Sequence, residues 1–107
     1  MAADEQKSSR KMTDIDRLIH EPARYNIMAL LYVLDEADFL FIVRQTDLTP
    51  GNLSSHLAKL EAAQYIAVVK DFVDRRPRTM LKLTDAGREA FREYSRRMKQ
   101  LFGGLEV

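Results

Sequence analysis

The 107-residue chain contains no cysteine, which excludes disulfides, zinc-finger sites and thiol nucleophiles. It also lacks an apolar run near the roughly 20 residues that a helix needs to cross a bilayer. Its first eleven residues, MAADEQKSSRK, lack the apolar stretch of a signal peptide. We therefore predict a cytoplasmic protein with no membrane partner, and we expect residues 1–11 to be a disordered tail.

Signatures of catalysis and cofactor binding are also missing. The sequence has no glycine-rich phosphate loop and no nucleophile paired with a base at a recognisable spacing. Its two histidines, His20 and His56, show no repeated ligand spacing, so no metal site is predicted. These absences predict a protein that is not an enzyme and needs no cofactor. Its length fits one domain, which we place at residues 12–107.

The net charge of +1 hides an uneven distribution. Residues 12–47 contain three basic and seven acidic residues, whereas residues 48–107 contain eleven basic and seven acidic ones. A basic half beside an acidic half indicates a surface that faces a polyanion. Solvated helix faces without a partner explain the charge equally well, so the local patterns have to decide.

Helical periodicity accounts for most of the first half of the chain. A short helix is predicted over residues 14–20. A second helix follows the break at Pro22 and covers residues 23–36, where apolar residues recur every three or four positions. Asp38 is placed to cap a third, short helix over residues 39–45, although the β-rich composition of that segment also allows a strand.

The most clearly marked helix covers residues 50–63. Thr49 is a favourable N-cap and Pro50 is a favourable first helical residue. From Leu53 onward, leucines recur at i, i+4 and i+7, which predicts a buried stripe on one side of the helix.

The second half of the chain reads as a hairpin followed by a long helix. Strands are predicted over residues 66–73 and 79–83, with a polar connection over residues 74–78. A helix over residues 84–102 follows, and two glycines end it. This order predicts an α+β, mostly helical winged helix-turn-helix, with a two-stranded β-hairpin wing at residues 66–83 and a long C-terminal dimerisation helix.

The helix over residues 50–63 has an outer face of small or hydrogen-bonding residues. Small residues let a helix sink into the major groove of DNA. Asn52 and Ser55 are placed to reach base edges, and Lys59 is placed to meet a phosphate. An ordinary amphipathic helix with a polar face would show the same pattern, so this helix alone leaves both interpretations open.

The hairpin favours the nucleic-acid interpretation. Arg75, Arg76 and Arg78 crowd its tip, and each strand adds a lysine. Two nearby aspartates neutralise part of this charge and leave the hairpin at +3. Because guanidinium groups crowded on an exposed turn repel one another, a phosphate row or a minor groove would stabilise the arrangement.

The last helix carries an apolar stripe longer than a domain of this size needs for its own core. A second copy of the same helix would cover its far end and give a twofold dimer. The alternative is a helix folded back on its own domain. The residues predicted to form the dimer contact are Phe91, Tyr94, Met98, Leu101 and Phe102.

The stretch LTPGNLSSHLAKLEAAQYIAVVKDFVDRRPRTMLKLTDAGREAFREY resembles small winged-helix regulators of the MarR and ArsR type. LSSHLAKLE resembles their recognition helix, and RPRTMLKLTDAGREAF resembles their wing and the start of their dimerisation helix. The resemblance covers roughly residues 22–94. It implies a homodimer that binds pseudo-palindromic promoter DNA, often as a repressor. With it, the predicted DNA-binding residues are Thr49, Pro50, Gly51, Asn52, Ser54, Ser55, His56, Lys59, Arg75, Arg76 and Arg78.

The sequence departs from this family pattern at two places. The thiolate ligands common in ArsR-type metal sensors are absent. Gln64 stands where the family often has glycine, so either Gln64 adopts a strained left-handed conformation or the helix ends differently.

Two further functional questions stay open at this stage. A small-molecule effector could bind between helices near Tyr25, Tyr32, Phe91 and Tyr94, although such aromatic residues more often form core. A winged helix can also serve as a protein-docking module without DNA specificity, and the modest net charge keeps that alternative open.

Overall fold

A computed structural model describes residues 12–103, and the predicted tail at residues 1–11 lies outside them. Within the described part, five helices and three strands follow the predicted order with one strand added. The elements are α2 (Asp14–Ile19), α3 (Pro22–Leu34), β1 (Glu36–Asp38), α4 (Phe39–Thr46), α5 (Pro50–Ala62), β2 (Ile66–Val73), β3 (Arg76–Leu83) and α6 (Asp85–Phe102). The predicted winged helix-turn-helix is confirmed.

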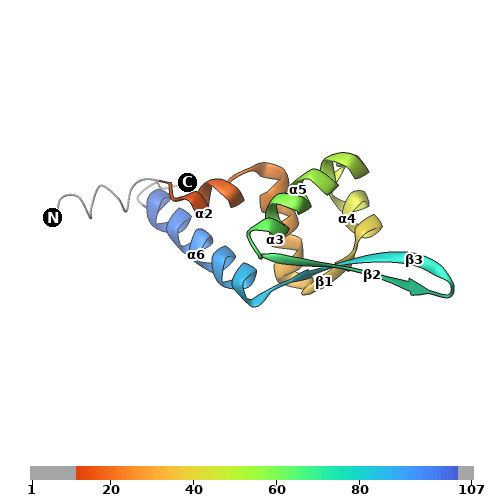
Figure 1. Cartoon of the computed structure of the whole chain (residues 1–107). Coiled ribbons are helices and arrows are strands. Elements are labelled where there is room, and N and C mark those ends of the chain that lie inside the picture. The colour runs from red at the N-terminus through yellow and green to blue at the C-terminus, as the bar shows by residue number, and fades with distance from the viewer. Residues whose placement is uncertain (1–11, 104–107) are drawn as a thin grey trace.

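Figure 1 shows how these elements are arranged. Helices α3, α4 and α5 form the body, the hairpin of β2 and β3 projects beyond it at one end, and α2 and α6 lie together at the other end. The core sits where these layers meet. Its fully buried side chains include Ile27, Leu31, Ile42, Leu53, Leu60 and Leu81. The stripe that begins at Leu53 is thus buried as predicted.

Strand β1 is the element that the sequence did not predict. Its three residues pair antiparallel with the inner half of β3, with Ala37 opposite Leu81, and they make a three-stranded sheet in the order β1-β3-β2. Glutamate and aspartate are depleted in strands, so local propensity argues against this element. The pairing with a distant strand, together with burial of Ala37, stabilises it.

The hairpin turn is shorter than predicted. Strand β3 already begins at Arg76, so the connection consists of Asp74 and Arg75 alone. Both residues have positive φ angles, 52° and 69°, as in a type I′ turn, whose twist matches that of the flanking strands. The predicted extent of the polar connection, residues 74–78, is therefore wrong.

Side-chain caps set the starts of α4 and α5 as the sequence predicted. The Asp38 carboxylate accepts hydrogen bonds from the backbone N–H groups of Leu40 and Phe41, which selects the helix rather than the strand for this segment. The Thr49 hydroxyl accepts from the Asn52 N–H at 3.1 Å, with Pro50 in the first helical position.

The end of α5 resolves the question about Gln64, which has a φ of 65°. The Tyr65 N–H donates to the Leu60 carbonyl at 3.0 Å, and the Gln64 N–H donates to the Glu61 carbonyl at 2.8 Å. These two bonds form a Schellman motif with glutamine in the left-handed position that glycine usually holds. The helix therefore ends in the turn that usually holds glycine, at the cost of backbone strain.

Glycine in place of Gln64 is expected to raise the free energy of unfolding by about 1 kcal/mol, because it removes this strain. Gln45, exposed inside α4, is the matched control. Glycine there is expected to lower the free energy of unfolding by about the same amount. Urea denaturation of both variants measures the two effects. A change of the same sign in the free energy of unfolding of both variants would contradict the interpretation that Gln64 is strained.

Gly87 fixes where α6 leaves the sheet. A Cβ atom at this position would lie 2.1 Å from the backbone oxygen of Tyr65. The N–H of Gly87 donates to the Thr84 hydroxyl, and the Thr84 N–H in turn donates to the same Tyr65 oxygen. This close approach joins the base of the wing to the start of α6.

Candidate nucleic-acid interface

The outer face of α5 is open along its whole length. Its residues are exposed and, apart from one lysine and one glutamate, small or uncharged: Pro50, Gly51, Asn52, Ser54, Ser55, Ala58, Lys59, Glu61 and Ala62. Thr49, just before the helix, is also exposed, although its hydroxyl is engaged in the cap. The structure thus places seven of the predicted DNA-binding residues on or beside one surface; His56 and the wing arginines lie apart from this face.

His56 differs from the rest of the predicted set. Its side chain is largely buried, and its Nδ1 lies 3.3 Å from Arg24 Nη1 and 3.6 Å from Glu21 Oε2. The Arg24 Nε also donates to the carbonyl of Leu18. Burial alone would raise the pKa of Glu21, but backbone N–H groups at the start of α3, His56 and Arg24 together lower it. His56 therefore holds α5 against the start of α3.

A groove of about 300 Å³ separates α5 from the hairpin. Ser54 and Ala58 line it from the helix, and Lys70 and Thr79 line it from the two strands. The exposed face of α5 and the adjoining face of the hairpin thus border one another. A single extended ligand can touch both.

Arg78 lies away from the hairpin tip, in strand β3. It makes a bidentate contact with Asp71, with nitrogen–oxygen distances of 2.9 and 2.7 Å, on the face of the sheet opposite α5. The hydrogen bonds from Arg78 lower the pKa of Asp71, and Asp71, Asp38 and Glu36 raise that of Arg78. Arg78 is thus the predicted wing residue whose charge the sheet itself neutralises.

Arg75 and Arg76 occupy the tip as predicted. Both are exposed, and neither makes an ion pair with any residue that the structure describes. Lys82 contacts Glu36 at 3.5 Å near the base of the wing, whereas Lys70 is exposed on the α5 side. The positive charge available to a ligand is therefore concentrated in the outer half of the hairpin.

Two of the five predicted dimer residues belong to the core of the single chain. Phe91 and Tyr94 are only 8% and 5% exposed, and they pack against α3 through Tyr25 and Tyr32, with ring centroids 5.3–6.0 Å apart. Met98 and Leu101 are half-buried, and Phe102 is 55% exposed. The aromatic residues considered for an effector pocket thus fill the space between helices.

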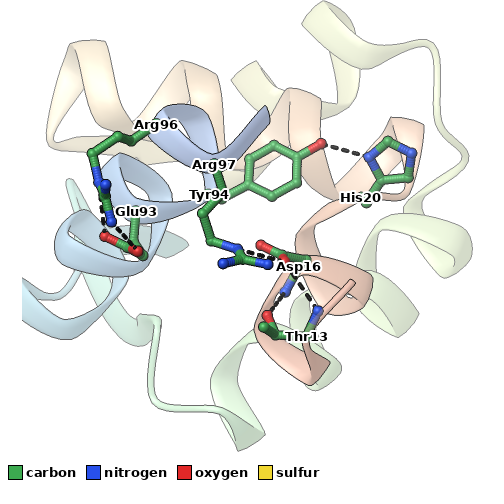
Figure 2. A network of polar contacts seen from close by, with 7 residues as sticks. All are labelled: Thr13, Asp16, His20, Glu93, Tyr94, Arg96 and Arg97. Atoms are coloured by element: carbon green, nitrogen blue, oxygen red, sulfur yellow. Dashed lines mark hydrogen bonds and ion pairs between the residues drawn. The ribbon is translucent and has the colours of Figure 1, made fainter. Parts of the chain in front are cut away.

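A polar network that the sequence did not indicate ties α2 to α6 (Figure 2). The Asp16 carboxylate, 1% exposed, accepts from the backbone N–H of Thr13 and from Arg97 Nε at 2.9 Å. The Asp16 N–H in turn donates to the Thr13 hydroxyl. Burial alone would raise the pKa of Asp16, but the hydrogen bonds from Thr13 and Arg97 lower it. Nearby, His20 and Tyr94 hydrogen-bond at 2.7 Å. This network fixes α2 across the far end of α6.

No group of three or more histidine and carboxylate side chains in residues 12–103 is placed to hold a metal ion. Over the same residues, no helix combines the length and the apolar character needed to cross a membrane.

Comparison with known proteins places this geometry among DNA-binding folds. Residues 23–102 match a family model described as a winged helix DNA-binding domain. An uncharacterised protein of Methanocaldococcus jannaschii is 34% identical over 90 residues, which cover 84% of this chain and 98% of that protein.

Solved structures show the same fold. A transcriptional regulator homologue from Pyrococcus horikoshii is 34% identical, with a TM-score of 0.83, covering 97% of this chain and 99% of that one. The transcriptional regulator BldR from Sulfolobus solfataricus has a TM-score of 0.65 at 15% identity, covering 98% and 79% of the two chains. The second likeness concerns the fold alone.

Proposed function

Because the chain belongs to the winged helix DNA-binding domain family, we propose that it is a transcriptional regulator that binds double-stranded DNA sequence-selectively. The observation that carries the proposal is one surface with two complementary parts. The outer face of α5 is mostly small and polar, and the hairpin beside it ends in two arginines that form no ion pair with residues 12–103.

In this proposal the two parts have different roles. Helix α5 lies in the major groove, where Asn52 and Ser55 contact base edges and Lys59 contacts a phosphate. Arg75 and Arg76 meet the minor groove or the backbone beside it. His56 acts through Arg24 and Glu21, by holding the helix in position.

We further propose that the protein acts in the cytoplasm as a homodimeric repressor on a pseudo-palindromic operator, without enzymatic activity. The exposed end of α6 at Phe102 supports a contact between two copies. Since Phe91 and Tyr94 are already buried, that contact would use the last turns of α6. The proposal requires no effector.

Alanine in place of Asn52 is expected to change the DNA sequence that the protein selects. The Asn52 side chain is exposed and makes no hydrogen bond within the described residues, so it is free to contact a base edge. A bidentate amide contact discriminates between bases by about 1–3 kcal/mol. Selection from randomised duplexes should recover a palindrome with wild-type protein, and one position per half-site should relax in the variant.

Alanine in place of Asn26, an exposed asparagine of α3, is the matched control and should recover the wild-type palindrome. Fluorescence anisotropy of the recovered duplex, titrated with protein and salt, should show two chains per site and a strong salt dependence. If the wild-type protein binds no duplex in a salt-sensitive way, the DNA-binding proposal fails and a protein-docking role is favoured.

A further inference from the structure

The strand register places an apolar pair at the outer end of the hairpin, on the face that looks toward α5. Phe72 pairs with Pro77 across the strands, two residues beyond the pair Lys70 and Thr79 that lines the groove. Side chains on a strand alternate between faces, so these two pairs share a face. The hairpin projects past the body of the domain (Figure 1). By the register, Phe72 and Pro77 belong to its outer end and continue its α5 side.

Little of the Phe72 side chain is buried by the fold. It is 73% exposed, more than Tyr25 at 45% or Phe102 at 55%. Pro77, directly opposite, is exposed as well and has a fixed backbone φ angle. A large apolar side chain beside a rigid ring, both held away from the core, forms a preformed contact surface for a ligand.

The charge around this pair indicates what that ligand is. Arg75 and Arg76 follow in the turn and the first position of β3, and Lys70 lies on the same face as Phe72. Asp74 is the one acidic side chain in the turn, and Asp71 is neutralised by Arg78 on the opposite face. Because side chains alternate along a strand, Arg76 lies on the opposite face together with Arg78. The apolar surface is thus bordered by Lys70 and Arg75, and it fits a polyanion with an apolar wall.

We infer that Phe72 and Pro77 form an apolar wedge that contacts the deoxyribose walls and base edges of the minor groove. The inference rests on the proposed function and adds a contact to it. The groove that Ser54 and Ala58 share with Lys70 makes the face of α5 continuous with the face of the wedge, so the duplex read by α5 reaches Phe72. Minor-groove proteins commonly use apolar side chains in this way.

The test compares Phe72→Ala with Val33→Ala, which removes another strongly exposed apolar side chain, on α3 and outside the proposed DNA and dimer contacts. The probe is a mixed-sequence duplex, and binding is followed by anisotropy across a salt series. We expect Phe72→Ala to weaken binding about tenfold with an unchanged salt slope, because an apolar contact releases no counterions. Val33→Ala should leave both the affinity and the salt slope unchanged.

A hydroxyl-radical footprint of the duplex selected by the protein tests the location, because the radical attacks sugars from the minor groove. The wedge predicts protected sugars beside each half-site, and Phe72→Ala should lose that protection alone. Wild-type affinity and an unchanged footprint in Phe72→Ala would overturn the wedge while the proposed function stands. A wild-type protein that binds no duplex would instead overturn the proposed function.

Two other results would also count against the wedge. A loss of thermal stability in Phe72→Ala that accounts for its weaker binding would assign Phe72 a structural role. Phe72-dependent binding to vesicles of phosphatidylcholine and phosphatidylserine, with duplex binding unaffected by the substitution, would assign the surface to lipid.

Discussion

Methionine in place of Arg97 is expected to lower the free energy of unfolding by about 3–5 kcal/mol. The substitution keeps the apolar part of the side chain and removes the guanidinium that contacts Asp16 at 2.9 Å. Asp16 is 1% exposed, so its carboxylate would be left charged, buried and short of a partner. For a domain of this size, each lost kcal/mol lowers Tm by roughly 4–8 °C.

Arg96 provides a matched control on the same helix (Figure 2). It pairs with Glu93 one turn away, and both side chains are well exposed. Methionine at position 96 is therefore expected to change the free energy of unfolding by less than about 1 kcal/mol. Asparagine at position 16 in the Arg97 variant should restore part of the loss, because it removes the uncompensated charge. If the substitutions at positions 16 and 97 changed the free energy of unfolding in a strictly additive way, the pairing of Asp16 with Arg97 would be contradicted.

The same pair predicts a change in acid stability. The pKa of Asp16 is lower in the folded protein than its ordinary value of 3.8. A carboxyl with a lowered folded pKa contributes stability above its unfolded pKa, and loses it as the pH falls through the folded pKa. The difference in unfolding free energy between wild type and the Arg97 variant should therefore be full near neutral pH and shrink below about pH 4. Urea titrations across that range measure it.

Alanine in place of both Arg75 and Arg76 is expected to weaken DNA binding more than any other change to the surface. Each phosphate contact contributes about 0.9 to the slope of log affinity against log salt, so two lost contacts flatten that slope by about 1.8 per wing. If the plots of log affinity against log salt for the wild type and the variant meet near 1 M salt, the variant binds DNA about sixty-fold more weakly per wing near 0.1 M. Anisotropy titrations at several salt concentrations measure both quantities.

The control for this variant is alanine in place of Arg96, which removes positive charge from the end of the molecule opposite the wing. It should leave the salt slope nearly unchanged. Thermal unfolding should also be unchanged in the double variant, since both arginines are exposed and outside any ion pair among the described residues. A wild-type slope in the double variant would remove the wing from the interface.

Local signals predicted most of the fold because each has a local physical cause. Thr49 and Asp38 cap helices whose starts the sequence revealed, and alternation marked strand β2 over its full length. Strand β1 escaped prediction because the residues that stabilise it lie in β3, 44 positions away in the pairing of Ala37 with Leu81. Non-local pairing of this kind leaves no local pattern.

In the candidate site, too, local features were predictable and features that depend on distant residues were not. Exposure of the α5 face followed from its periodicity, but the positions of individual charges depended on register. A hairpin turn two residues long moves Arg78 into the sheet beside Asp71, while Arg75 stays at the tip. His56 contacts Arg24, and Asp16 contacts Arg97, at separations of 32 and 81 residues. Each partner lies on another helix, so no spacing in the sequence predicts the contact.

The φ of 69° at Arg75 has a consequence for any attempt to stabilise this domain. A non-glycine residue in the left-handed region costs roughly 1–2 kcal/mol, and Asn-Gly is the pair that best fits such a turn. This chain instead holds an arginine at the outermost point of the hairpin. Glycine in place of Arg75 is thus the most obvious substitution for stabilising the wing, but it removes the positive charge at the tip. Stability and DNA binding therefore place opposite demands on this one residue.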